Sequence, residues 1–161
     1  MKLLYTSLVR PHLEFAAPIW NPYVRKDIVK LENVQHRATR IHGFEGVCYE
    51  DRLHKFGLIS LETRRERGDM IQYYKINKSI GKVNWSNPPK VNNNSKKRGH
   101  NQKLQEQLIH VSGKRFHFFT NRIVNKWNSL TEEVNSSNNV NIFKNNFDRF
   151  EKINKKNMID K

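Results

Sequence analysis

The sequence contains only one cysteine, Cys48, among its 161 residues. A lone thiol cannot form an internal disulfide or a cysteine-based zinc site, so neither can stabilise this chain. Apolar runs are short, and none approaches the roughly 18 residues of a membrane-spanning helix. The N-terminus also lacks a cleavable signal pattern. These absences predict an intracellular protein, nuclear or cytoplasmic, with no membrane partner.

Glycine is scarce as well, and the seven glycines are scattered along the chain. They form no phosphate-cradling loop and no nucleophile elbow. The acidic doublets Glu50-Asp51 and Glu132-Glu133 stand where helices are expected to begin, a place where carboxylates suit the helix dipole. His36, His42 and Cys48 lack the spacing that puts two metal ligands on one helix face. The sequence therefore predicts no catalytic residues, no metal, no cofactor and no enzyme activity.

Acidic residues are half as frequent as basic ones, with 15 Asp and Glu against 30 Lys and Arg. The resulting net charge of +15 favours a polyanionic partner. The excess is uneven, because residues 86–127 contain nine basic residues and one acidic residue. We expect nucleic acid to bind mainly along this quarter of the chain.

Apolar residues recur at helical spacing in most of the chain, and no alternating strand pattern is clear. The fold class predicted is all-α, an irregular bundle of about five to six helices with a polar loop near residues 82–101. The expected helices are 2–17, stopped by Pro18; 27–41, with Asp27 as N-cap and Gly43 as the stop; 49–56, closed by Gly57; Ser60 to about Ser79; a stripe of Phe116, Phe119, Ile123, Trp127 and Leu130; and a stripe of Val140, Phe143, Phe147 and Phe150. Residues 102–112 fit a short strand or a helix equally.

Pro11 lies inside the apolar stripe of the first expected helix, between Leu8 and Phe15. An interior proline costs about 3 kcal/mol and kinks or ends a helix. Two interpretations remain open, a bend within one helix or a new helix that begins near Pro11.

Composition divides the chain into three parts. Residues 1–81 form a helical region, residues 82–101 a polar linker rich in Asn, and residues 102–161 a C-terminal helical region. The linker is equally consistent with a solvated flexible tether.

The candidate nucleic-acid contacts are basic residues expected outside the apolar stripes. They are Arg64, Arg65 and Arg67 in one helix, Lys96, Lys97 and Arg98 in the polar loop, and Lys114, Arg115, Arg122 and Lys126 around the Phe-rich stripe. The alternative for each helix is a solvated basic face. For Arg64 to Arg67 it includes local pairs with Glu62, Glu66 and Asp69. The Phe residues are predicted to be core rather than base-stacking platforms.

Four stretches, in this order, resemble the reverse transcriptase of non-LTR retrotransposons, the LINE elements of the jockey and chicken-repeat-1 types. They are "LLYTSLVRPHLEFAAPIWNPY", "DIVKLENVQHRATRI", "YEDRLHKFGLISLETRRERGDMIQYYKI" and "FFTNRIVNKWNSLTEEV". The resemblance covers about residues 3 to 150 of this chain. The similar part of the family's reverse transcriptase is the thumb and the region that follows it.

This resemblance implies a thumb-like region that grips the template–primer duplex through its phosphate backbone, without sequence specificity. It also implies a parent polyprotein, an RNA-directed DNA polymerase whose palm and fingers would be partners of this piece. The family's palm signature, an aromatic residue followed by Ala-Asp-Asp, is absent from this sequence. Without those metal-holding carboxylates we expect no polymerase activity from this chain.

Two other readings of the function stay open. The stripe of Ile28, Leu31, Ala38 and Ile41 is narrow enough to dock one partner helix, which fits a protein–protein interaction module. The second reading is that the chain is a translated remnant of a decayed element and has no function.

Overall fold

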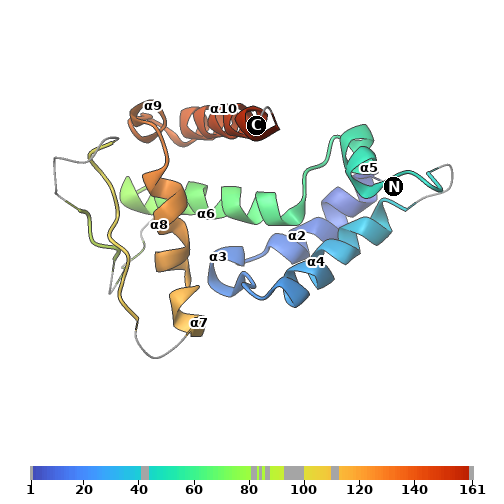
Figure 1. Cartoon of the computed structure of the whole chain (residues 1–161), viewed down its shortest axis with the longest axis horizontal. Coiled ribbons are helices and arrows are strands. Elements are labelled where there is room, and N and C mark those ends of the chain that lie inside the picture. Colours follow the sequence, from blue (N-terminus) through green and yellow to red (C-terminus); the bar gives the residue numbers. More distant parts are fainter. Residues whose placement is uncertain are drawn as a thin grey trace. The chain divides into compact units, whose positions relative to one another are not determined.

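The computed structural model describes residues 2–40, 44–80, 83, 85, 88–92, 100–109 and 113–159, with side chains as far as residue 154. The chain divides into two compact units, Met1–Asp69 and Met70–Lys161. Both are built mainly from helices, as predicted, and the fold is all-α (Figure 1). Within the described ranges the only strand-like pairing is an isolated antiparallel bridge between Val91 and Leu104.

The helical segments are more numerous than the five to six that we predicted, because several expected helices are divided into single turns. The first unit contains α1 (Lys2–Leu4), the π-helical turn η1 (Tyr5–Val9), α2 (Arg10–Glu14), α3 (Ala17–Trp20), α4 (Arg25–Ala38), α5 (Tyr49–Phe56) and the first half of α6 (Leu61–Asn77). The second unit contains the end of α6 and then α7 (Gly113–Phe116), α8 (Phe119–Asn128), α9 (Glu132–Asn135) and α10 (Val140–Ile159).

The chain stays helical through Pro11, but it changes its hydrogen-bond register just before that residue. The backbone N–H of Arg10 donates to the carbonyl of Tyr5, five residues earlier, which makes the preceding turn π-helical. Pro11 then stands at the start of α2, where its missing N–H costs least. The π turn, a common place for helix bends, is thus how this segment accommodates the proline.

The first helical segment ends earlier than predicted. Glu14 is the last residue of α2, and Ala16 adopts a left-handed conformation with φ of 50°. Pro18 does not stop a helix but stands in the first turn of α3, a position that suits proline.

The predicted boundaries of α5 and α6 are confirmed. Gly57 closes α5 with φ of 56°, a left-handed conformation that glycine adopts without strain. Ser60 caps α6, since its Oγ accepts a hydrogen bond of 3.2 Å from the N–H of Thr63. By contrast, the N-cap of α4 is Val24 rather than Asp27. The same helix ends at Ala38, with Thr39 as its C-cap, which is three residues before the predicted end at Ile41. The predicted stop residue Gly43 lies outside the described residues.

A buried polar network joins the elements of the first unit. The side chain of Gln35 is fully buried and accepts a 2.8 Å hydrogen bond from the hydroxyl of Tyr5. Its amide nitrogen donates to the carbonyl of Ile59 at 3.1 Å. Glu32 accepts hydrogen bonds from the hydroxyl of Tyr49 at 2.6 Å and from the N–H of Leu61 at 3.0 Å. The carboxylate therefore stands at the N-terminus of α6, where the helix dipole favours negative charge.

The core of the second unit surrounds Trp127, which is fully buried. Its ring contacts Tyr73 edge-on, with 4.6 Å between centroids, and stacks near Phe143 at 6.1 Å. Its indole N–H donates to the carbonyl of Gln102 at 2.9 Å. The end of α6, α8 and α10 thus share one aromatic cluster, in which the two predicted stripes meet.

Two described residues of the polar segment, Trp85 and His100, and Leu104 just after it contact the core of the second unit. The ring of Trp85 packs against the aromatic core, 6.0 Å from that of Phe119. His100 is buried and bonds the carbonyl of Trp127 at 2.9 Å. Leu104 is also buried, and both its backbone groups bond the side-chain amide of Asn128. These three residues are thus held by specific contacts with the second unit.

Candidate nucleic-acid interface

The three predicted contact residues of α6 lie in different environments. Arg64 donates two hydrogen bonds to the carboxylate of Glu14 in α2. The side chain of Arg65 is buried, with only 2% of its surface exposed. Arg67 is half-buried. Their guanidinium groups therefore do not form one exposed basic patch.

The two predicted residues of α8 already make contacts within the chain. Arg122 donates to the carbonyl of His117 at 3.1 Å, and its guanidinium lies 5.8 Å from the ring centre of Phe119. The ammonium of Lys126 forms an ion pair of 2.7 Å with Glu151 in α10. Both side chains would have to give up these contacts to bind phosphate directly. The predicted loop residues Lys96, Lys97 and Arg98 lie outside the described part of the chain.

Lys114 and Arg115 differ from the other candidates. Both lie in α7, both are exposed, and neither makes a hydrogen bond or an ion pair through its side chain with another described residue. Their charges are therefore free to attract an anion from solvent.

The break between α7 and α8 exposes two aromatic rings beside these charges. Phe118 has an extended backbone, with ψ of 158°, and serves as the N-cap of α8. The Phe116 side chain is 40% exposed and the Phe118 side chain 49%, whereas Phe119 is buried in the core. The prediction that Phe116 belongs to the core stripe is wrong. The single helix expected for this stripe is interrupted between Phe116, the end of α7, and Phe119, the start of α8.

We call residues Lys114, Arg115, Phe116, His117 and Phe118 the α7 surface. The imidazole of His117 stands perpendicular to the ring of Phe116, with 5.3 Å between centroids. Adjacent cations and exposed rings are the groups that bind phosphates and stack on unpaired bases. One sequence signal could have revealed Phe118, since it lies off the helical stripe that contains Phe119 and Trp127.

Within the described ranges, no three His, Cys, Asp or Glu side chains gather as a metal site requires. None of the described helices combines the length and the apolar character that crossing a bilayer demands. Comparisons with protein families, with curated proteins and with solved structures found no match to this chain.

Proposed function

We propose that this chain binds nucleic acid through the phosphate backbone, without sequence specificity, at the α7 surface. The observation that carries the proposal is the exposure of Lys114 and Arg115 next to Phe116 and Phe118. Contacts to phosphate position a protein on nucleic acid but carry no base information. The net charge of +15 adds long-range attraction for any polyanion.

The exposed rings make the proposal more specific. Stacking of a base on an aromatic side chain contributes about 1–3 kcal/mol and is available only where bases are unpaired. The α7 surface is therefore better suited to a single strand, or to the unpaired end of a template, than to the interior of a duplex.

The resemblance to the thumb region of non-LTR reverse transcriptases supports the same function. In that setting the chain would hold template and primer while a separate palm carried the catalytic carboxylates. We accordingly propose that the chain does not polymerise DNA by itself.

A second candidate function, protein–protein contact, is favoured by the first helical segment. Leu3, Phe15 and Ile19 are 78%, 77% and 72% exposed. Exposed large apolar side chains in one segment are typical of interaction sites. Ile28, Leu31 and Ala38 of the predicted docking stripe are instead half-buried. We propose that the first segment contacts the palm of the parent polyprotein.

The nucleic-acid proposal is tested by measuring affinity for single-stranded and duplex DNA and RNA of unrelated sequences across a range of salt concentrations. We expect log K to fall linearly with log salt, by about 0.7 per phosphate contact on single strands. We also expect similar affinities across sequences of equal length and tighter binding of single strands. Salt-independent binding, or none near physiological salt, would contradict the proposal.

The second function is tested by titrating the labelled chain with the purified palm and fingers of a jockey-type reverse transcriptase. Binding that is weakened by Leu3→Ser/Phe15→Ser, with unchanged affinity for nucleic acid, would support it. Equal binding of the variant would exclude the first segment as the contact.

A further inference from the structure

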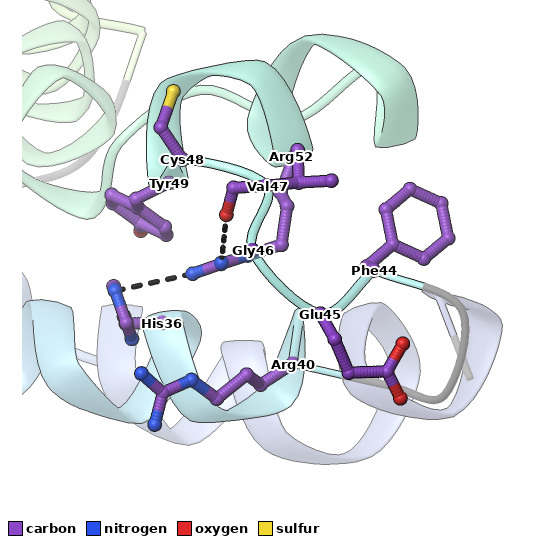
Figure 2. A pocket seen from close by; sticks show the side chains of 9 residues that line it. All are labelled: His36, Arg40, Phe44, Glu45, Gly46, Val47, Cys48, Tyr49 and Arg52. Atoms are coloured by element: carbon purple, nitrogen blue, oxygen red, sulfur yellow. Dashed lines mark hydrogen bonds between the residues drawn. The ribbon is translucent and has the colours of Figure 1, made fainter.

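The first unit contains an open pocket of about 660 Å³ lined by residues from the end of α4, from 44–48 and from the start of α5. Figure 2 shows His36 and Arg40 on the α4 side of this pocket and Arg52 reaching into it from α5. Pockets of this volume are of the size that small ligands occupy. The α7 surface belongs to the other unit, and the two sites share no residue.

Arg52 is the unusual residue of the pocket, because it is buried and its hydrogen-bond partners among the described residues carry no negative charge. The residue is only 4% exposed. Its three hydrogen-bond partners are the hydroxyl of Thr39 at 3.4 Å, the carbonyl of Val47 at 2.6 Å and the Nε2 atom of His36 at 3.1 Å. All three are uncharged acceptors. A buried guanidinium is costly unless an anion lies beside it.

The hydrogen-bond count of Arg52 is also incomplete. A guanidinium carries five N–H groups, and these three contacts use one on each nitrogen. One N–H on each terminal nitrogen therefore remains for a further acceptor. The face of the Tyr49 ring, 5.7 Å from the guanidinium carbon, is a weak partner for the remaining charge.

The contact with Arg52 fixes the tautomer of His36, and this leaves the other ring nitrogen of His36 as a donor. Arginine can only donate, so Nε2 of His36 must be the acceptor, and Nδ1 carries the hydrogen of the neutral ring. Burial lowers the pKa of His36, and the positive charges of Arg52 and Arg40 lower it further. Glu50 acts in the opposite direction and raises it.

Arg40 adds a second positive charge to the lining of the pocket. The residue is exposed, and its guanidinium forms no ion pair with any described residue. Glu45 is the acidic residue that lines the pocket, and it is also exposed. One carboxylate against two arginines leaves the pocket with an excess positive charge.

We propose that this pocket binds a phosphate group, with the Arg52 and Arg40 guanidinium groups as its ligands. Arginine pairs with phosphate oxygens through two hydrogen bonds, and Arg52 retains one spare N–H on each terminal nitrogen. The phosphate belongs either to a small molecule such as a nucleotide or to the end of a nucleic-acid strand. The proposal does not depend on the α7 surface.

The test is an NMR titration of the full chain with inorganic phosphate, in which chloride holds the ionic strength constant and the His36 ring signals are followed. We expect a saturable shift of those signals. Arg40→Ala should weaken phosphate binding about tenfold, as the loss of one charge-assisted contact implies. Arg37→Ala is the matched control, because Arg37 is exposed in the last turn of α4, three residues before Arg40, and does not line the pocket. It should change the affinity less than twofold.

Arg52→Lys keeps the positive charge but removes the paired N–H donors of the guanidinium. It should also weaken phosphate binding about tenfold. Because Arg52 is buried, Arg52→Lys tests the proposal only if its amide spectrum shows an intact fold. If it does not, the test rests on the phosphate affinity of Arg40→Ala. Absence of saturable phosphate binding, or equal losses in Arg37→Ala and Arg40→Ala, would overturn the proposal.

The source of the phosphate is identified in a Lys114→Ala/Arg115→Ala background, which removes the α7 contribution. A nucleoside monophosphate is compared there with an oligonucleotide carrying a 5′-phosphate or a 5′-hydroxyl. A gain of fivefold or more from the 5′-phosphate would assign the pocket to strand ends. Tighter binding of the monophosphate would assign it to a small ligand. Failure of inorganic phosphate to bind, with oligonucleotide binding retained in the unaltered chain, would refute this pocket and leave the α7 proposal standing.

Discussion

Arg64 and Glu14 are joined by two hydrogen bonds across fifty residues of sequence. The side chains of both residues are about one-third exposed or less. The pair connects α2 to α6 within the first unit. It involves the guanidinium of Arg64, which the sequence predicted as a phosphate contact.

Arg64→Ala should therefore affect stability more than nucleic-acid binding. We expect it to lower the free energy of unfolding of the first unit by about 1–2 kcal/mol, because a partly screened, charge-assisted pair is lost. Urea titration followed by the amide signals of α4 measures this effect. A double-mutant cycle with Glu14→Ala should show coupling of about 1 kcal/mol. Additive effects together with a large loss of nucleic-acid affinity would show that Arg64 serves binding instead.

Trp127→Ala should be among the most destabilising single changes in the second unit. The residue is fully buried among aromatic rings, and its indole N–H is bonded to Gln102. Removal of such a side chain typically costs about 3–5 kcal/mol. Phe116→Ala is the control, because Phe116 is 40% exposed and should cost less than about 1 kcal/mol. Thermal or urea unfolding compares the two, and a loss below about 1 kcal/mol for Trp127→Ala would contradict the core described here.

The pKa of His36 should lie below 6.5, first because of burial and then because of the charges of Arg52 and Arg40. In the unfolded chain this ring takes up a proton near pH 6.5, whereas the folded ring stays neutral until a lower pH. The unfolded state thus binds more protons in that interval, and His36 makes the first unit less stable as pH falls through it. NMR titration of the ring measures the pKa, and Arg40→Ala should raise it. A pKa above 6.5, or no change in the variant, would refute this electrostatic account.

The fold shows which features the sequence could predict. The helical fold class, the glycine that ends α5 and the serine that caps α6 follow from local rules, which depend on a few neighbouring residues. The aromatic stripe of α8 also predicted its own burial, because helical spacing places Phe119 and Trp127 on one face.

The candidate site was harder to predict, because partners distant in the sequence decide whether a basic residue is available. Nothing near Lys126 in the sequence indicates its ion pair with Glu151. The exposure of Phe116 depends on where α7 ends, and helix boundaries are poorly fixed by local preference. Arg52 was not singled out either, since its burial in the pocket arises from the packing of α5 near the end of α4.

The exposed rings of the α7 surface should contribute to affinity without contributing to the salt dependence. Phe116→Ala/Phe118→Ala should weaken binding of single strands about tenfold, since stacking on at least one base is lost. The slope of log K against log salt should not change, because no phosphate contact is removed. Duplex binding should fall less than single-strand binding. Fluorescence anisotropy with labelled oligonucleotides measures both, and a changed slope with unchanged affinity would contradict the stacking role.

The most direct test of the α7 surface is the salt dependence of single-strand binding by Lys114→Ala/Arg115→Ala. Two lost phosphate contacts should reduce the slope of log K against log salt by about 1.4, with equal effects on unrelated sequences. The matched control is Arg149→Ala/Lys152→Ala, which removes two exposed charges from α10 and should leave the slope nearly unchanged. A shallower slope in the α7 variant alone is the result we predict. Equal reductions in both variants would show that bulk charge, and not the α7 surface, binds the nucleic acid.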